Sequence, residues 1–218
     1  MAARFWVNTG STTNWSATVP TNWAATSGST TKVAVPGSGD DVTFDGAGNG
    51  NSASVVSANI TILSLTFTAG YTNTVTINTA RTLTIAGNFT DNTAHSWTVS
   101  GTGSMAISAA STITSGGKTF PGPVTFSGVG TNKTLSGNWS ISGLLTIGST
   151  GTINATTSET LTCSGITVSN NLSTGTAKIV LSGGIWSGAG TLYNDLDIAG
   201  NVTVSGGVFF GSSHILTY

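Results

Sequence analysis

The sequence predicts an all-β protein, a right-handed parallel β-solenoid with coils of about 19 residues. A short phrase of alternating aliphatic and polar residues at 82–88 (Thr-Leu-Thr-Ile-Ala-Gly-Asn) returns at 195–201 (Asp-Leu-Asp-Ile-Ala-Gly-Asn). Looser copies recur at similar spacing between and beyond them, and no stretch shows the apolar period of a helix. An antiparallel β-sandwich, which also has many short strands, is the alternative.

The repeated phrase has an apolar first residue, a mostly polar second residue and an apolar third residue. Alternate residues of a strand face opposite sides, so the first and third residues are expected to stack inward from coil to coil. The aligned first residues are Leu65, Leu83, Met105, Val124, Leu145, Leu161, Ile179, Leu196 and Ile215. The predicted inward core includes Leu83, Ile85, Val124, Phe126, Leu145, Ile147, Leu196 and Ile198.

The composition is neutral and rich in hydroxyl groups. Charged residues make up 6% of the chain, the net charge is −1, and Ser and Thr together account for about a third of the 218 residues. This balance argues against a nucleic-acid-binding surface, and no stretch approaches the roughly 18 apolar residues of a membrane span. A mean hydropathy of +0.21 with so little charge offers weak repulsion between copies, which favours self-association.

The N-terminal segment, residues 1–40, is predicted to be a Trp-rich cap or anchor, with solenoid repeats over residues 41–218. Three of the six tryptophans fall in the first 23 residues, where they can cover the apolar end of the coil stack. A sugar-stacking platform is the alternative. The candidate anchor residues are Phe5, Trp6, Trp15 and Trp23.

Both ends of the chain carry an expectation. The N-terminus lacks an apolar stretch of signal-peptide length, so synthesis in the cytoplasm is expected. The last residues stop partway through a repeat phrase, so the solenoid is expected to continue, or to be capped by a partner, beyond residue 218. The single cysteine, Cys163, alternates with Leu161 and is predicted to be a small buried hydrophobe.

Acidic residues form two candidate constellations. Asp195 and Asp197 lie two apart on one strand, with Cα atoms about 6.7 Å apart, a spacing that resembles an inverting glycosidase pair. Two solvated strand residues are the preferred interpretation. Asp40, Asp41 and Asp45 precede a glycine-rich segment but lack the calcium-loop pattern, so turn and strand-end roles are preferred.

Other chemical patterns are weaker. The two histidines, His95 and His214, have no recognisable metal-ligand spacing. Thr-x-Thr pairs could bind ice, but the array does not continue along the repeats. The sequence therefore predicts no catalytic residue, no cofactor and no metal site.

Two phrases resemble a loose group of tailed-bacteriophage virion proteins. One combines Asn14-Trp15-Ser16 with residues 35–45 (Val-Pro-Gly-Ser-Gly-Asp-Asp-Val-Thr-Phe-Asp), and the other is residues 117–130 (Gly-Lys-Thr-Phe-Pro-Gly-Pro-Val-Thr-Phe-Ser-Gly-Val-Gly). Some bacterial surface β-helix adhesins share the Asn-Trp and Pro-Gly-x-x-Asp elements. The resemblance implies a virion surface component such as a head fibre, decoration protein or tail-fibre segment, and it supplies no catalytic residues.

These observations predict a non-enzymatic structural component of a phage virion that projects from or decorates the particle surface. The expected partners are further copies of the chain, with a homotrimer favoured because the resembling fibres are commonly trimeric, and the major capsid or another virion protein. A host surface glycan is a further expected partner, whereas nucleic acid and membrane are not expected. A glycan-binding adhesin or a β-helical polysaccharide depolymerase is the alternative function.

Overall fold

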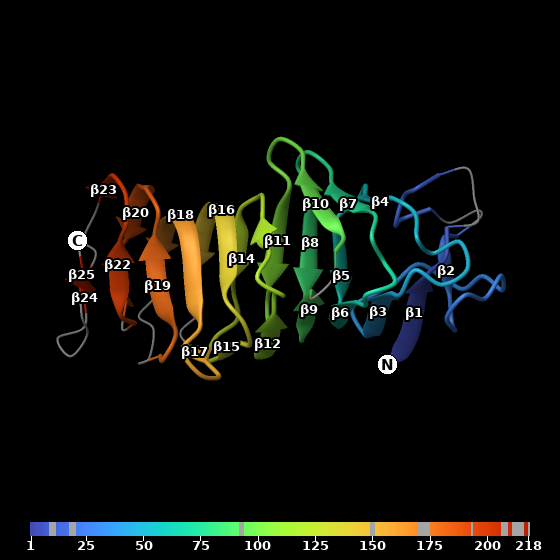
Figure 1. The fold of residues 1–218 in the computed structure, drawn as a ribbon, viewed down its shortest axis with the longest axis horizontal. Coiled ribbons are helices and arrows are strands. Elements are labelled where there is room, and N and C mark those ends of the chain that lie inside the picture. The colour runs from blue at the N-terminus through green and yellow to red at the C-terminus, as the bar shows by residue number, and fades with distance from the viewer. Residues whose placement is uncertain are drawn as a thin grey trace. The chain divides into compact units, whose positions relative to one another are not determined.

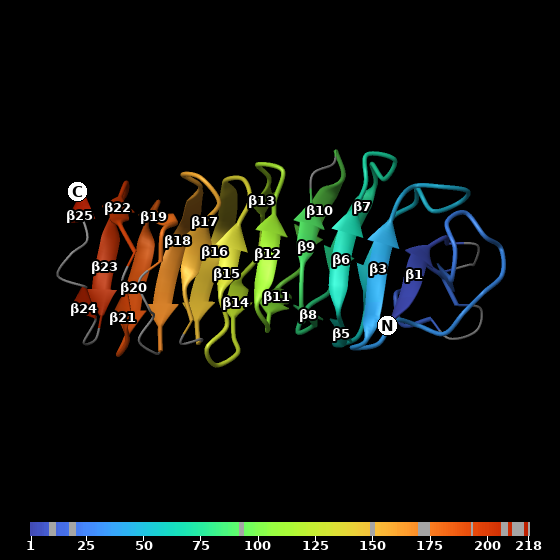
Figure 2. The same ribbon diagram turned by 90° about the horizontal axis from the view of Figure 1, so that it is seen from below.

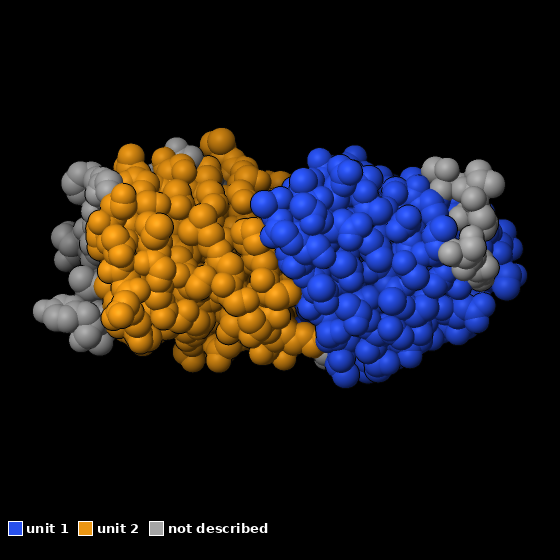
Figure 3. Space-filling model, turned by 90° about the horizontal axis from the view of Figure 1, so that it is seen from above, with its two compact units in different colours: residues 1–105 blue, residues 106–218 orange. Residues whose placement is uncertain are grey.

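The computed structural model describes residues 1–8, 12–17, 21–91, 94–148, 151–169, 175–192, 194–205, 209–210 and 216–217. Regular structure in these residues consists of strands, which confirms the predicted all-β fold. Successive coils pair in parallel, so the predicted β-solenoid is confirmed and the antiparallel sandwich is wrong. The chain divides into two compact units, residues 1–105 (unit 1) and 106–218 (unit 2), which Figure 3 colours separately.

Unit 1 is built from coils that place one short strand in each of three sheets. β3, β6 and β9 lie side by side in the first sheet, β4, β7 and β10 form the second, and β5 and β8 pair in the third (Figures 1 and 2). β1 extends the first sheet in parallel with β3, and β2 pairs with β1 in the antiparallel sense. The bounds are β1 (Ala2–Trp6), β2 (Trp23–Ala24), β3 (Asp40–Phe44), β4 (Ser54–Val56), β5 (Ile60–Ile62), β6 (Ser64–Phe67), β7 (Thr74–Ile77), β8 (Thr82–Ile85), β9 (Phe89–Asp91) and β10 (Ser96–Val99).

Unit 2 follows a related plan in which two strands, β16 and β18, are nine residues long, and β11 (Ser104–Ile107) spans the boundary between the units. β12, β15 and β17 pair in one row, while β16, β18, β19 and β22 lie side by side in another (Figure 1). The remaining bounds are β12 (Ser111–Thr114), β13 (Thr119–Phe120), β14 (Val124–Phe126), β15 (Lys133–Leu135), β16 (Trp139–Ile147), β17 (Ile153–Ala155), β18 (Thr160–Val168), β19 (Lys178–Leu181), β20 (Gly184–Gly188), β21 (Thr191–Leu192), β22 (Leu196–Ile198), β23 (Val202–Ser205), β24 (Phe209–Phe210) and β25 (Leu216–Thr217).

Glycines on successive coils of unit 2 allow a single strand to pair in two neighbouring rows of strands. The first half of β16 pairs with β13 and the second half with β14, with a register shift between Ile141 and Leu144. Gly143 lies in this shift, and a Cβ there would clash with the backbone of Gly122 on the preceding coil. Gly184 has a φ of 81°, a conformation that side chains other than glycine rarely adopt. The coil therefore bends at a residue that only glycine accommodates.

The predicted alignment of the repeated phrase is partly wrong in unit 1. The step from Leu83 to Met105 is correct, because β8 and β11 are adjacent and the hydroxyls of Thr82 and Ser104 are hydrogen-bonded, but the step from Leu65 to Leu83 is wrong. Leu65 of β6 pairs with Val42 and Phe89, whereas Leu83 of β8 pairs with Ile60 in a different sheet. The two phrases therefore belong to different sides of the coil. They look alike because a strand on either side needs the same inward aliphatic and outward hydroxyl alternation.

In unit 2 the alignment is partly correct. The step from Val124 to Leu145 and the steps from Leu161 through Ile179 to Leu196 match the observed registers. Leu145, however, pairs with Ile166 and not with Leu161, because the two lie on opposite sides of the glycine bend. Ile215 lies outside the described residues, and its neighbour Leu216 pairs with Leu196.

The coil length changes along the chain. Paired residues on adjacent coils of unit 1 are 21 to 24 residues apart, as in Ser54 with Val75 and Leu65 with Phe89. In unit 2 the separation falls from 22 to 20 and then to 17 residues. The predicted repeat of about 19 residues is shorter than most of these separations, because the predicted steps from Leu65 to Leu83 and from Leu145 to Leu161 do not join adjacent coils.

The predicted core positions are almost all buried. Of the eight residues named above, seven are fully buried, and Ile198 is half-buried. Cys163 is also buried as predicted, and burial raises the pKa of its thiol to about 12.

Turn asparagines link one coil to the next. The Oδ1 atom of Asn59 accepts a hydrogen bond from the backbone N–H of Thr82 at 3.0 Å, and Asn138 accepts one from Thr160 at 2.8 Å. In each case the next residue, Ile60 or Trp139, points into the core. The recurrent Asn-x-Thr/Ser pattern thus places a turn amide, an inward side chain and an outward hydroxyl in succession.

Candidate functional site

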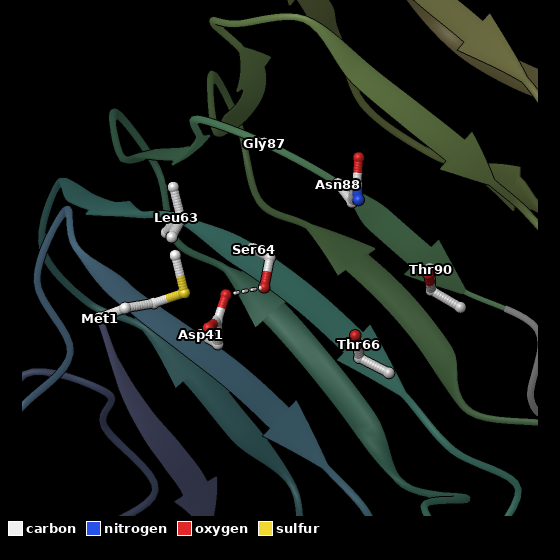
Figure 4. A pocket seen from close by; sticks show the side chains of 8 residues that line it. All are labelled: Met1, Asp41, Leu63, Ser64, Thr66, Gly87, Asn88 and Thr90. Carbon is white, nitrogen blue, oxygen red and sulfur yellow. Dashed lines mark hydrogen bonds between the residues drawn. The ribbon is translucent and has the colours of Figure 1, made fainter.

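The outer surface of unit 1 carries a groove of about 390 Å³ over the first sheet (Figure 4). Five polar residues line it, and Leu63, Gly87 and Met1 form the rest of its wall. The polar residues are Asp41, Ser64, Thr66, Asn88 and Thr90.

Strand register brings these polar groups together from three coils. Asp41 of β3 pairs with Ser64 of β6, and Thr66 of β6 pairs with Thr90 of β9. The backbone C=O of Asn88 accepts a hydrogen bond from the N–H of Leu65 at 3.0 Å, which places Asn88 beside Ser64. Two parallel polar columns result, with neighbouring strands about 4.8 Å apart. The sequence pattern does not reveal this grouping, because the residues come from coils more than 20 positions apart.

The carboxylate in the groove is held in place. The Oγ atom of Ser64 donates a hydrogen bond to Oδ1 of Asp41 at 2.5 Å (Figure 4). Because this bond spans two adjacent strands, Asp41 has a defined orientation.

The three clustered aspartates serve separate partners. Asp40 lies 3.3 Å from Nε of Arg4 and accepts a hydrogen bond from the N–H of Gly37 at 3.0 Å. Asp45 accepts a hydrogen bond from the N–H of Ala47 at 3.0 Å, a turn-type contact. In the part of the chain that the structure describes, no three His, Cys, Asp or Glu side chains are grouped so that they could hold a metal ion.

The pair Asp195 and Asp197 has a cationic neighbour that the sequence did not reveal. Asp197 is half-buried and forms an ion pair with Lys178, while Asp195 is exposed. The ion pair forms because β19 and β22 are adjacent, with Val180 opposite Asp197. Glycosidase chemistry needs one carboxyl group as general acid and another as base or nucleophile. The ion pair with Lys178 instead gives Asp197 a structural contact between two strands.

His95 sits in a buried polar cluster. Its Nδ1 lies 3.2 Å from Oδ1 of Asp91, and Oδ2 of Asp91 accepts a hydrogen bond from the indole of Trp97 at 2.7 Å. The imidazole stacks on Phe67 with ring centres 4.0 Å apart. Asp91 and His95 are both nearly inaccessible to solvent, so this cluster holds the core of unit 1 together and does not face a substrate. His214 lies outside the described residues.

The candidate anchor tryptophans point into unit 1. Trp6, Trp15 and Trp23 are each 0% exposed, and all three rings lie within 6 Å of the ring of Phe44. The indole N–H of Trp23 donates to the C=O of Trp15 at 2.9 Å.

This packing is that of a cap over the first coil, and a fully buried indole is not available to stack on a sugar. Phe5 is half-buried. The predicted boundary after residue 40 falls at β3, the strand with which β1 pairs. The role of the segment as an anchor to a partner stays a prediction.

Two buried charged residues were missed by the sequence analysis. Lys133 is fully buried at an inward position of β15, where its ammonium group donates to the C=O of Ala109 at 2.7 Å, to that of Ser127 at 3.2 Å and to the hydroxyl of Thr131 at 2.7 Å. Burial lowers the pKa of Lys133 to about 8. Lys133 is the middle residue of an Asn-x-Thr triplet (132–134), a position that points inward in this fold. This pattern is the signal that could have identified Lys133 as buried.

Glu159 stabilises a turn through hydrogen bonds to its carboxylate. Its carboxylate accepts hydrogen bonds from the Thr156 hydroxyl at 2.6 Å and from the N–H and hydroxyl of Thr157 at 2.8 and 3.0 Å. These bonds, led by that from Thr156, lower the pKa of Glu159 to about 2. The side chain therefore remains ionised at neutral pH and acts as a turn acceptor.

Comparison with models of protein families, with curated proteins and with solved structures finds no match to this chain. Over the residues described, no helix has the length and apolar character needed to cross a membrane.

Proposed function

We propose that this chain is a non-enzymatic structural component of a phage virion, one that projects from or decorates the particle surface. The observation that carries the proposal is that eight of the titratable side chains described above hold coils and turns together. The resemblance of residues 35–45 and 117–130 to tailed-phage virion proteins supplies the setting. The engaged side chains are Arg4, Asp40, Asp91, His95, Lys133, Glu159, Lys178 and Asp197.

Hydrogen-bonded hydroxyl groups on adjacent coils support a role as a rigid structural element. Thr74 and Ser96 approach to 2.8 Å between hydroxyl oxygens, and Thr82 and Ser104 to 3.0 Å. These bonds add to the parallel backbone pairing without adding charge. A stack stabilised in this way is suited to a rigid projection.

We also propose that copies associate, with a trimer as the leading state. Unit 2 exposes Leu144 at 41% and Ile185 at 52%, on either side of Gly165, which has no side chain to separate them. Exposed aliphatic groups on a surface with few charges favour contact with a further copy. Closed trimers leave no growing edge, which fits a projection of fixed size. The segment spanning residues 4–23 would contact the major capsid or another virion protein.

The particle itself tests the proposal. An antibody against the purified chain should label isolated particles in immunoelectron microscopy, and light scattering should give a trimer mass for the chain. A variant lacking residues 1–23, checked for folding by circular dichroism, should no longer bind particles. Labelling of the bacterial cell envelope, with particles unlabelled, would contradict the virion assignment and favour an adhesin.

A second experiment addresses the depolymerase alternative. The chain and the double variant Asp195→Asn with Asp197→Asn are incubated with a panel of bacterial surface polysaccharides. No cleavage is expected from either protein. Cleavage by the native chain that disappears in the double variant would establish an enzyme.

A further inference from the structure

We infer that the groove on the outer face of unit 1 binds a saccharide that is neutral or bears an amino group. This inference goes beyond the proposed structural role, because a structural component of a particle does not need to bind a ligand. It is tested on the isolated chain, so its failure and the failure of the virion proposal are distinguishable.

The size and depth of the groove fit a short segment of a larger ligand. Its volume of about 390 Å³ lies at the lower end of the range found for small-molecule sites. The groove lies on the outer surface across the adjacent strands β3, β6 and β9, so a chain of sugar rings bound there can extend beyond it. Buried pockets, by contrast, favour small compact ligands.

The polar groups form a regular pattern of hydrogen-bonding positions. Thr66 and Thr90 place hydroxyls on adjacent strands, and the side chain of Asn88 lines the groove beside the column of Asp41 and Ser64. Hydroxyl and amide groups can both donate and accept, which matches the mixed donors and acceptors of sugar hydroxyls. The strand spacing of about 4.8 Å repeats these positions on the scale of a single sugar ring.

The charge in the groove selects among saccharides. Asp41 is the carboxylate among the lining residues, whereas the neighbouring Asp40 is paired with Arg4. Asp41 accepts from Ser64 through Oδ1, so Oδ2 can accept a bond from a sugar hydroxyl or an ammonium group. A hexuronate or other anionic sugar would be repelled by this carboxylate.

The remaining wall supplies an apolar edge. Leu63 is half-buried at the rim, and Gly87 has no side chain to fill the space beside it (Figure 4). Sugar rings carry C–H groups on one face and hydroxyls around the edge. A ring can therefore rest against Leu63 while its hydroxyls contact the polar columns.

Isothermal titration calorimetry on the full chain tests the inference. The probes are oligomers of glucose, galactose and N-acetylglucosamine, a glucosamine oligomer as the amino sugar, and a galacturonate oligomer as the anionic control. At least one of the neutral or amino probes is expected to bind, and the galacturonate oligomer is not. Binding by none of the four, or tighter binding of the galacturonate oligomer, would overturn the inference.

Two matched variants locate the site. Thr66→Trp places a bulky side chain in the groove, whereas Thr84→Trp makes the same change at an outward position of β8 that does not line it. Binding should fall about tenfold or more in Thr66→Trp and remain within about twofold in Thr84→Trp. Equal binding by both variants would exclude the groove.

Asp41→Asn provides an independent measurement if Thr66→Trp does not fold. It keeps the shape of the side chain and an acceptor for Ser64 while removing the charge. The glucosamine oligomer should lose more affinity than the neutral oligomers, because it loses an ionic contact. Unchanged affinity for every probe would show that Asp41 does not contact the ligand.

Discussion

Unit 1 combines buried aliphatic side chains with a continuous stack of aromatic rings, whereas unit 2 fills most of its interior with aliphatic side chains. In unit 1 a stack of rings follows the coils, with centres 5.6 Å apart from Trp6 to Phe44, 4.9 Å from Phe44 to Phe67 and 4.0 Å from Phe67 to His95. In unit 2 the inward rows are made mostly of Leu, Ile and Val, with Phe120, Phe126, Trp139, Cys163 and Trp186 among them.

The difference goes with the placement of glycines, and only later along the chain with the length of the coil. Paired residues on adjacent coils are 21 to 24 residues apart in unit 1, where rings fill much of the interior. In unit 2 the separation is still 22 between Trp139 and Leu161, where the glycines of β16, β18 and β20 bend the strands. It falls to 17 between Ile179 and Leu196. The glycine bends therefore begin before the coil shortens.

The largest expected effect is on the ring stack of unit 1. Phe44→Ala removes the ring that contacts Trp6, Trp15, Trp23 and Phe67, and should lower the free energy of unfolding by about 3–5 kcal/mol. Chemical denaturation measures the loss, and hydrogen exchange by mass spectrometry locates it. Exchange should accelerate mainly in residues 1–105. Equal acceleration in both units would contradict separate cores.

The matching change in unit 2 is Ile147→Ala. Ile147 is fully buried and pairs with Phe126 and Val168, so its truncation should cost roughly 2–5 kcal/mol, with exchange accelerating in residues 106–218. Ile147→Val, which removes one methyl group, is the control and should cost about 0.5–1.5 kcal/mol. A negligible cost for Ile147→Ala would show that this interior is not closely packed.

A pH-dependent effect distinguishes the buried lysine of unit 2. Burial lowers the pKa of Lys133 to about 8 from an ordinary 10.5, so between these values the unfolded chain holds a proton that the folded chain has released. The stability contributed by this residue should therefore rise with pH across that window, by on the order of 1–2 kcal/mol.

Comparison with Lys133→Met isolates this effect. The variant should lack the rise when denaturation is measured at pH 7.5 and 9.5. Tyr71 and Cys163, whose pKa values burial raises to about 12, lower stability at high pH but do so equally in both proteins. Parallel pH profiles of the two proteins would contradict the shifted pKa of Lys133.

The smallest effect is expected from the turn at Glu159 and appears in acid. The hydrogen bonds from Thr156 and Thr157 lower the pKa of Glu159 from 4.5 to about 2, so their stabilisation is present above pH 4.5 and is lost as pH falls toward 2. Glu159→Gln should therefore lower the urea midpoint at pH 6 and converge with the native chain near pH 2. A constant difference at both pH values would show that charge has no part in the turn.

Much of the fold was predictable because the alternation of inward and outward residues in a strand depends only on the local sequence. In β8, Leu83 and Ile85 face inward and Thr84 faces outward, as the alternation of apolar and polar residues in the sequence predicts. The candidate groove was not predictable, since Asp41, Ser64 and Asn88 lie on three coils and become neighbours only through register. The ion pair between Lys178 and Asp197 was also not predictable from the sequence.

The sequence by itself determined the all-β class, the parallel stacking of short repeats and the burial of the alternating aliphatic positions. Only the tertiary structure decided which repeat stacks on which, as with Leu145 and Ile166, and where polar groups from separate coils gather. The physical reason is that inward and outward positions depend on the two-residue period of a single strand. Register depends instead on where each coil turns, and residues such as Gly143 make those turns through contacts with neighbouring coils.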